Sequence, residues 1–355
     1  MFPKFLKNKN KTYFVAEISA NHSGKLSNAL DMIEKAAKAG ASAIKFQAYK
    51  PESMTLNSKK KYFYIKDKKS LWKNENLFEL YSKGHTPYNW FKKLFNFAKK
   101  KKITAFSSVF DEDGVDFLES VGNPIYKISS LENNHYPLLK KVSKTKKPLI
   151  ISTAMSSMEE VEETVNFIEN TQPEYQDSNK LAILQCVAMY GEPEDQYANL
   201  SVISSLRQKF SNHAIGYSDH TIGNYAANIA VALGAKILEV HFTDDKSRDF
   251  RDHHISVTKE ELLNLKQNIL KTHTLLGSSK KDPVLEIETS DRIFEFRRSC
   301  YLKYDCKSGD IINENNLTTL RPNKGIDSRD YFKLLGKKLV VNKKAFEAIF
   351  WDDLE

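Results

Sequence analysis

Two histidines follow short apolar runs at matching positions in the sequence. His220 comes shortly after one such run, and His241 closes the next. If the two runs are neighbouring parallel strands, their ends meet at one edge, and the two imidazoles could share a divalent cation. Asp219 and Glu239 lie beside the histidines and could orient or supplement them. A lone histidine after a strand is usually structural, but two at equivalent strand ends favour a metal site.

Two lysines and one glutamate interrupt apolar runs. Lys45 and Lys127 each lie within such a run, so their side chains would point into the interior of the fold or into its mouth. There an ammonium group could bind a phosphate or a carboxylate as a point charge. Glu17 lies deep in the first apolar run, where an unpaired charge would be costly. We expect all three side chains to have a functional role.

Polar residues also end other apolar runs. Ser130, Ser152 and Ser218 could bind an anion, but serine at a strand end also forms turns and caps, so both interpretations stay open. Glu132 follows Ser130 and adds a carboxylate to the same group. Lysines, hydroxyls, histidines and carboxylates would therefore converge on one rim if the runs are parallel strands of one sheet.

These residues stand at the ends of a repeated strand–helix pattern. The predicted strands, apolar nearly throughout as in strands buried on both faces, are residues 13–18, 43–49, 103–107, 125–128, 148–152, 181–186, 214–218 and 237–241. The predicted amphipathic helices are residues 25–39, 88–101, 113–120, 137–143, 158–169, 200–210, 224–233 and 259–276. Eight such units in about 250 residues predict an α/β fold, the closed (β/α)8 TIM barrel, with active residues at the C-terminal ends of its strands. An open doubly wound sheet is less favoured, because no G-x-G-x-x-G motif or P-loop follows a strand.

One connection is much longer than the others. Residues 50–87 separate the second strand from its helix and are rich in aromatic side chains. Long loops in compact domains are usually functional, so we expect this segment to roof the mouth of the barrel. Among the helix ends, Asp111 and Ser156 are expected N-caps, and Gly40 and Gly234 are expected at C-terminal ends.

The pattern changes after the last predicted helix. Residues 278–290 contain Gly, Ser, Lys and Pro and are interpreted as a linker. We therefore expect a barrel domain over residues 1–277 and a small α+β or β-clip-like domain over residues 291–355. The latter has short β-like runs and scattered glycines but no long helical pattern.

Composition narrows the class of protein. Of the 355 residues 41% are hydrophobic, which is enough for a substantial core and excludes a disordered chain. No run approaches the ~18 apolar residues of a membrane span, and the basic N-terminus lacks the apolar stretch of a secretory signal. The net charge of +9 lies mostly in lysine runs without interleaved aromatics, which favours an anionic metabolite over nucleic acid. We expect a reduced, cytoplasmic enzyme with cysteines that only pack, because no base adjoins them: Cys186, Cys300 and Cys306.

The strand-end motifs occur together in one order along the chain. They are residues 17–24 (EISANHSG), 45–47 (KFQ), 126–130 (YKISS), 151–153 (IST), 216–221 (GYSDHT) and 239–243 (EVHFT). In this combination they resemble the bacterial nonulosonic (sialic) acid synthases. The C-terminal motifs resemble the antifreeze-like (SAF) domain of the same family; they are residues 297–299 (RRS), 316–318 (NLT), 320–322 (LRP) and 334–338 (LLGKK). The resemblance covers essentially the whole chain.

The resemblance implies an activity and roles for residues. Such enzymes condense phosphoenolpyruvate with an open-chain N-acetylated aminosugar and release phosphate, with Mn²⁺ or Mg²⁺ near the sugar aldehyde. It implies His220 and His241 as metal ligands and catalytic residues, and Glu17 or Glu132 as the catalytic proton-transfer group. It implies phosphoenolpyruvate binding by Lys45, Lys127, Ser130, Ser152 and Ser218. The sugar is implied to lie near Glu17, Glu132, Tyr190 and Asp252, with Arg321 reaching its N-acetyl group across a domain-swapped homodimer.

The long connection and several departures bear on the substrate. Residues 55–57, 71–72, 77–81 and 86–90 look closest to pseudaminic acid synthases, which favours a 2,4-diacetamido-2,4,6-trideoxyhexose. N-acetylneuraminate or legionaminate synthesis, a 3-deoxy-octulosonate-type synthase and a non-catalytic sugar-phosphate-binding homologue stay as alternatives. The sequence also departs from the family at four places. Ala188 replaces a polar residue that contacts phosphoenolpyruvate, and Val240 replaces a lysine in strand eight. Residues 249–251 replace Pro-Gly-Pro, and Val109 replaces a proline after strand three.

Overall fold

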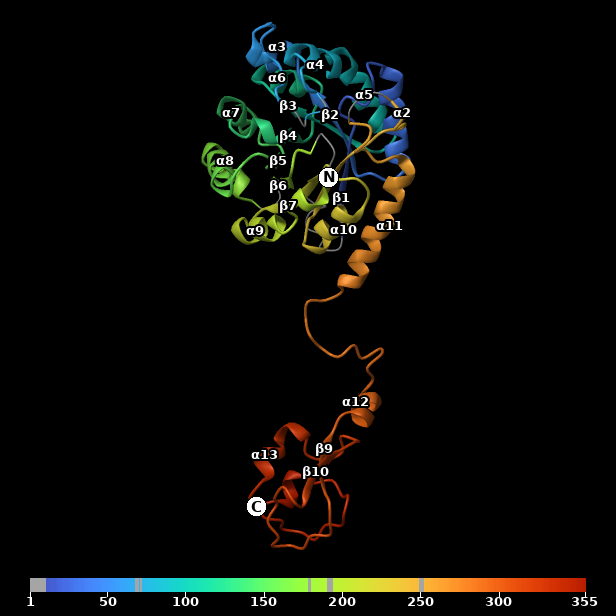
Figure 1. Ribbon diagram of the computed structural model, residues 1–355, viewed down its shortest axis with the longest axis vertical. Helices are drawn as coiled ribbons and strands as arrows, with labels where there is room; N and C mark the ends of the chain where they lie inside the picture. Colours follow the sequence, from blue (N-terminus) through green and yellow to red (C-terminus); the bar gives the residue numbers. More distant parts are fainter. Residues whose placement is uncertain (1–10, 68–69, 71, 178–179, 190–193, 249–251) are drawn as a thin grey trace. The chain divides into compact units, whose positions relative to one another are not determined.

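The chain divides into two compact units, Met1–Gly277 and Ser278–Glu355. The computed structural model describes residues 11–67, 70, 72–177, 180–189, 194–248 and 252–355. Figure 1 shows the first unit from blue to orange and the second in orange and red. All but one of the residues singled out above for the site belong to the first unit, so its architecture decides how they meet.

The first unit is a closed barrel of eight parallel strands. They are β1 (Tyr13–Glu17), β2 (Ala43–Ala48), β3 (Thr104–Val109), β4 (Tyr126–Ile128), β5 (Leu149–Ser152), β6 (Leu181–Cys186), β7 (Ala214–Asp219) and β8 (Ile237–His241). Each strand pairs with its sequence neighbours, and β8 pairs with β1 to close the ring. The predicted barrel is confirmed, and the strand ends differ from the expected ones by at most two residues.

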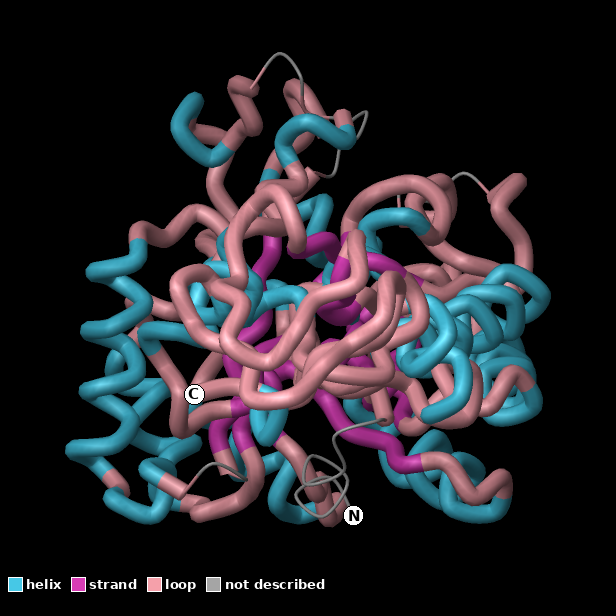
Figure 2. Tube along the Cα trace, turned by 90° about the horizontal axis from the view of Figure 1, so that it is seen from below, coloured by secondary structure: helices cyan, strands magenta, loops and turns pink. Residues whose placement is uncertain are grey.

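A helix follows each strand and packs outside the ring (Figures 1 and 2). The eight are α2 (Leu26–Lys38), α5 (Tyr88–Lys100), α6 (Glu112–Ser120), α7 (Tyr136–Lys144), α8 (Met158–Thr171), α9 (Val202–Lys209), α10 (Tyr225–Ala232) and α11 (Lys259–Leu276). Short 3₁₀ turns among the described residues are η1 (Lys61–Phe63), η2 (Ser130–Glu132), η3 (Pro173–Gln176), η4 (Asp195–Tyr197), η5 (Ser328–Asp330) and η6 (Trp351–Asp353).

The expected helix ends are mostly confirmed. Asp111 caps α6 by accepting a hydrogen bond from the backbone N–H of Gly114 (2.6 Å). Gly40 and Gly234 follow helices with φ of +75° and +102°, which glycine adopts without strain. Ser156 was the wrong cap: Ser157 forms a capping box with the glutamate three residues later. Both serines have a glutamate at that spacing, so the sequence did not distinguish them.

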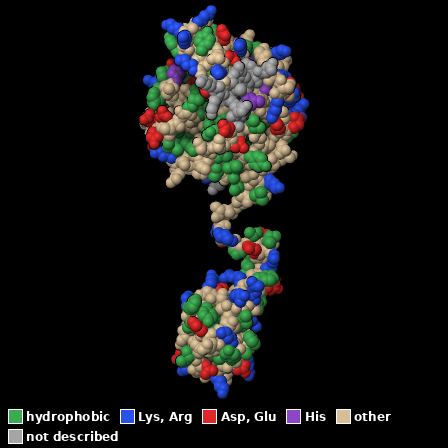
Figure 3. Space-filling model, in the orientation of Figure 1, with side chains coloured by type: hydrophobic (Ala, Val, Ile, Leu, Met, Phe, Trp, Pro, Cys, Tyr) green, Lys and Arg blue, Asp and Glu red, His purple; other side chains and the backbone are tan. Residues whose placement is uncertain are grey.

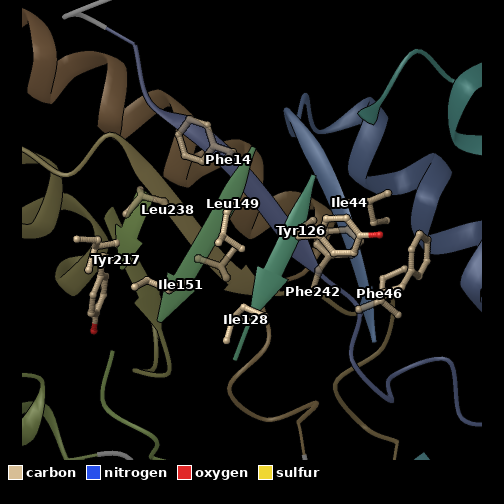
Figure 4. Close-up of a cluster of buried hydrophobic side chains, with 14 of the residues drawn as sticks. Phe14, Ile44, Phe46, Tyr126, Ile128, Leu149, Ile151, Tyr217, Leu238 and Phe242 are labelled. Carbon is tan, nitrogen blue, oxygen red and sulfur yellow. The ribbon is translucent and has the colours of Figure 1, made fainter. Parts of the chain in front are cut away.

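Two apolar layers hold the barrel together, because successive strand side chains point to opposite faces. One set lies between the strands and the helices, where Figure 4 shows Phe14, Ile44, Leu149, Ile151 and Leu238. The other set fills the interior; it comprises Tyr13, Val15, Ala43, Phe106, Ile125, Ile150, Ala182, Leu184 and Ile237. The polar residues at the strand ends continue this interior face, so they lie directly above the apolar interior of the barrel.

The long connection is folded and fixed to the barrel. It contains α3 (Pro51–Met54) and α4 (Leu77–Gly84), both labelled in the blue-to-teal part of Figure 1. Asn76, which is 5% exposed, caps α4 and donates from Nδ2 to the carbonyl oxygen of Ser58 (2.9 Å). The Tyr49 hydroxyl, just after β2, donates to the carbonyl oxygen of Tyr81 in α4 (3.3 Å).

The second unit has its own small core. Helix α12 (Ser290–Phe296) precedes an antiparallel pair, β9 (Ser299–Leu302) and β10 (Leu317–Leu320), and α13 (Tyr331–Leu334) follows. Cys300 and Cys306 lie in its apolar cluster, as expected. Residues 278–289 form no helix or strand. Within the described parts of both units, no helix has the length and apolar character needed to cross a membrane.

Candidate functional site

A cavity of about 300 Å³ lies at the C-terminal ends of the strands. Most of the predicted site residues line it: Glu17, Lys45, Lys127, Ser130, Glu132, Ser152, Ser218, His220, His241 and Asp252. The segment 50–87 also contributes to its lining, so its expected place at the mouth is confirmed. Tyr190 lies outside the described residues. Arg321 belongs to the second unit, where its Nε donates to the carbonyl oxygen of Phe296 (2.8 Å).

Two buried lysines and two buried glutamates form one ion-pair network. Lys45 Nζ lies 3.0 Å from Glu17 and 3.2 Å from Glu239 Oε1. Lys127 Nζ lies 3.5 Å from the same oxygen of Glu239. All four side chains are at most 6% exposed. Because an isolated charge at this depth would be strongly unfavourable, each lysine depends on these carboxylates.

The two lysines are held differently. Burial lowers the pKa of both, but at Lys45 the carboxylates of Glu17 and Glu239 outweigh burial and raise it above the ordinary value. At Lys127 burial dominates, because Glu239 compensates only in part and Lys45 repels it, so its pKa is lowered. Burial would raise the pKa of Glu239, but Lys127 and Lys45 hold it well below its ordinary value. Lys127 is thus the cation that an added anion would stabilise more.

The three serines divide between structural and available roles. Ser130 Oγ accepts a hydrogen bond from the backbone N–H of Ala154 (3.0 Å), which joins the loop after β4 to the loop after β5. Ser218 Oγ donates to Glu239 Oε1 (3.2 Å) and so joins the ion-pair network. Ser152 Oγ is buried at the cavity without a hydrogen-bond partner among the described residues. It is therefore a hydroxyl ready to donate to an anion.

The two histidines converge, as their positions predicted. Their Nε2 atoms lie 3.3 Å apart. On the other side of each ring, His220 Nδ1 lies 3.5 Å from Cys186 Sγ, and His241 Nδ1 lies 3.9 Å from Asp252 Oδ2. The Cys186 contact at His220 Nδ1 can orient that ring for ligation through Nε2, whereas 3.9 Å is too long for a hydrogen bond between Asp252 and His241 Nδ1. The pair therefore presents two nitrogens to one point of the cavity.

The donor set fits a divalent cation. Two nitrogens bonded to one ion at roughly 2.1 Å stand about 3 Å apart, close to the observed separation. Burial, and then His241, lower the pKa of His220 to about 3, so its imidazole is neutral and able to ligate. Within the described ranges no group of three or more His, Cys, Asp or Glu side chains converges as a metal site. A cation held by the two histidines would need further ligands.

The hydrogen bonds and ion pairs of Asp219 and Glu239 go mainly to residues other than the histidines. Asp219 Oδ1 accepts from the backbone N–H and the hydroxyl of Thr221 (2.8 and 2.7 Å), which shapes the turn after β7. Glu239 turns to Lys45 and Lys127 instead. The two lysines lie on β2 and β4, which like β8 are alternate strands and contribute to the same interior layer, and a carboxylate there is drawn to the nearest cations.

The two candidate proton-transfer carboxyls differ in setting. Glu17 is ion-paired with Lys45, and its Oε1 accepts from Gln47 Nε2 (3.0 Å). Glu132 is hydrogen-bonded to the Ser129 hydroxyl, and burial raises its pKa above the ordinary value. A carboxyl with a raised pKa is better able to hold a proton near neutral pH. Glu132 is therefore suited to carry a proton in this site.

Several site residues were missed. Gln47 donates from Nε2 to both Glu17 and Ser19 (3.0 and 3.2 Å), and Ser19 Oγ donates to Asp252 (2.5 Å). Gln47 lies two positions after Lys45, so strand alternation could have found it. Ser19 has φ of +49°, a strained conformation for a serine at this site.

The expectation that all three cysteines merely pack was wrong for Cys186. Its Sγ lies 3.5 Å from His220 Nδ1, although the two residues are far apart in sequence. Burial raises the pKa of this thiol to about 11, so it is uncharged at neutral pH. Cys186 therefore contacts a base that the local sequence did not reveal.

The departures from the family motifs have different consequences. Val240 and Val109 are buried in the outer apolar layer, on the face of their strands opposite to the cavity. Ala188 lines the cavity and supplies no hydrogen bond from its side chain. Residues 249–251 lie outside the described ranges. The substitutions Val109 and Val240 therefore leave the cavity lining unchanged. Ala188, by contrast, changes the lining.

The chain is similar in sequence and fold to several known proteins. The NeuB family matches residues 32–281. The chain is 38% identical over 346 residues to a pseudaminic acid synthase of Campylobacter jejuni, covering 97% of each. It is 35% identical over 339 residues to an N,N'-diacetyllegionaminic acid synthase of that species, covering 96% of this chain and 99% of the relative.

A solved structure agrees with these relatives. The N-acetylneuraminic acid synthetase of Leptospira borgpetersenii, crystallised with citrate, matches with a TM-score of 0.69 at 30% identity. It covers 80% of this chain and 94% of that one. The family match spans well over half of the chain, and the relatives extend over nearly all of it. The chain belongs to the NeuB family.

Proposed function

We propose that this chain is a nonulosonic acid synthase. It condenses phosphoenolpyruvate with an open-chain 2,4-diacetamido-2,4,6-trideoxyhexose of the pseudaminic type and releases phosphate. The observation that carries this proposal is the cavity in which Lys45 and Lys127 lie beside the His220–His241 pair. An anion site next to a cation site is what a reaction between phosphoenolpyruvate and a sugar aldehyde requires.

The substrates divide between the two parts of the cavity. Lys127 and the Ser152 hydroxyl bind the phosphate and carboxylate of phosphoenolpyruvate, together with Lys45, Ser130 and Ser218. Lys127 is incompletely neutralised by the protein, and Ser152 Oγ has a hydrogen bond to give. Charge-assisted hydrogen bonds of this kind are the strong ones.

The sugar lies near the histidines and the carboxylates Glu17, Glu132 and Asp252. His220 and His241 would hold a Mn²⁺ or Mg²⁺ ion, which when bound polarises the aldehyde oxygen as a Lewis acid. Tyr190 is assigned to the same sugar site from the family resemblance. Asp252 lies 3.9 Å from His241 Nδ1 and is assigned to a sugar hydroxyl from the family resemblance.

The reaction balances with one added water. The methylene carbon of phosphoenolpyruvate forms a bond to the aldehyde carbon, and water adds to the carbon that carries the phosphate. The C–O bond to phosphate then breaks, and inorganic phosphate leaves. Glu132, with its raised pKa, exchanges protons with the reacting oxygens, while Glu17 is ion-paired with Lys45 and helps to position it.

The second unit completes the proposal. We assign it as an antifreeze-like (SAF) domain whose Arg321 reaches the N-acetyl group of the sugar in the cavity of the other protomer of a domain-swapped homodimer. The enzyme would act in the cytoplasm, where phosphoenolpyruvate is made, without nucleic acid or membrane as a partner.

A phosphate-release assay tests the proposal. The protein is given phosphoenolpyruvate with each candidate sugar, with and without Mn²⁺: the diacetamido-trideoxy sugars of pseudaminic and legionaminic configuration, and N-acetylmannosamine. We expect metal-dependent release, fastest with the pseudaminic-type sugar. Faster release with either other sugar would establish legionaminate or N-acetylneuraminate synthesis instead. Absence of release with every sugar would favour a non-catalytic sugar-phosphate-binding protein.

A further inference from the structure

The cavity has two chemically different parts. Its floor carries the charged and polar side chains at the strand ends. The part contributed by the segment 50–87 is apolar, and we call the following residues the apolar wall: Met54, Ile65, Leu77, Leu80 and Tyr81. No charged side chain from the described part of this segment lines the cavity. Apart from the Tyr81 hydroxyl, a sugar that touches this wall would meet hydrocarbon; Trp72 and Gly84 of the same segment also line the cavity.

The apolar wall is fixed by contacts within the chain. Asn76 fixes the start of α4 through its cap and its hydrogen bond to Ser58. Tyr49 packs edge-to-face against Tyr81, with ring centroids 5.8 Å apart, and its hydroxyl is taken up by the Tyr81 carbonyl. At the end of the segment, Thr86 Oγ1 is hydrogen-bonded to His22 Nε2 (3.1 Å). A wall held at several points can discriminate by shape and polarity.

We propose that the apolar wall receives the C4–C6 end of the sugar and selects sugars that carry methyl groups there. This inference rests on the proposed function, which places C1 at the histidines and phosphoenolpyruvate at the lysines. The far end of the open chain is then directed away from the charged floor. The lining that remains includes the apolar wall together with other apolar side chains, such as Phe110, Leu131 and Met155, and we place this end of the sugar against the wall.

The candidate sugars differ at this end. A 2,4-diacetamido-2,4,6-trideoxyhexose has a methyl group at C6 and an acetamido methyl at C4. N-acetylmannosamine has hydroxyl groups at both carbons, and these would lose water without gaining a partner on the wall. An apolar pocket rejects an added hydroxyl by about 100-fold. The wall therefore selects trideoxy sugars as a class, and both the pseudaminic and the legionaminic configuration satisfy it.

The test compares one sugar with its 6-hydroxy counterpart. In the unmodified protein we expect kcat/KM for the trideoxy sugar to exceed that for the 6-hydroxy sugar by about 100-fold. Leu80→Asn places an amide of similar size on the wall and should lower this ratio at least tenfold, with the KM for phosphoenolpyruvate unchanged. Leu56→Asn is the matched control, because Leu56 is in the same segment but 69% exposed. It should leave the ratio as it is.

The outcomes separate this inference from the proposed function. Phosphate release at equal kcat/KM for both sugars, or an equal loss for both in Leu80→Asn, would overturn the wall and keep the synthase. Calorimetric binding of the trideoxy sugar provides a second readout. If no sugar releases phosphate, binding that Leu80→Asn weakens and Leu56→Asn does not would still support the wall. Failure of the trideoxy sugar to bind would overturn it.

Discussion

Replacing Glu239 by glutamine would remove the shared carboxylate of the ion-pair network. Its Oε1 lies 3.2 Å from Lys45 and 3.5 Å from Lys127, with all three side chains buried. Breaking a buried pair while leaving the cations in place costs about 3–5 kcal/mol. With about 2–4 °C per kcal/mol for a domain of this size, Glu239→Gln should lower the Tm by roughly 6 °C or more.

The same variant should respond more strongly to anions. Phosphoenolpyruvate or inorganic phosphate would replace the negative charge that Lys45 and Lys127 lose in this variant. Either ligand should therefore raise the Tm of Glu239→Gln more than that of the unmodified protein. Differential scanning calorimetry with and without ligand measures both effects. Asp116→Asn is the control, because the Asp116–Lys141 pair (2.5 Å) lies on the surface and should contribute at most about 1 kcal/mol.

The loss of stability in Glu239→Gln should depend on pH. The lysines hold the pKa of Glu239 below its ordinary value, so its stabilising charge is fully present above about pH 4.3 and is lost as pH falls below it. The stability difference between the two proteins should therefore be largest near neutral pH and shrink from about pH 5 towards pH 3. A Tm for Glu239→Gln equal to that of the unmodified protein at pH 7, or a difference that persists at low pH, would refute the reasoning.

Three further variants test the metal and sugar assignments. His241→Ala should abolish tight Mn²⁺ binding, followed by electron paramagnetic resonance, while the circular dichroism of the barrel stays unchanged; retained binding would contradict the assignment. Cys186→Ala should weaken Mn²⁺ binding by about 10–100-fold by removing the group at His220 Nδ1, and Cys186→Ser, which keeps a hydrogen-bonding atom, should largely restore it. Arg321→Ala should raise the KM for the sugar far more than that for phosphoenolpyruvate. Equal increases would argue against its contact with the N-acetyl group.

The barrel and most of the residues at its rim could be predicted from the amino-acid sequence. Strand and helix patterns are local, so the apolar runs and amphipathic stretches predicted the elements to within a residue or two. Alternation along each strand is also local. It places Lys45 and Gln47 on one face, and Glu239 and His241 on another strand's equivalent face, before any tertiary contact is known.

The ion pairs and hydrogen bonds among these side chains became evident only from the fold. The register across the closed ring brings Glu239 to two lysines rather than to the histidines, and brings Cys186 beside His220. The folding of the segment 50–87 likewise brings Leu80, on helix α4, to the lining of the cavity. Such contacts join residues far apart in the chain, and they depend on how strands are staggered around the barrel and how a long segment folds over it. No local pattern encodes those distances, which is why the rim was predictable and its partnerships were not.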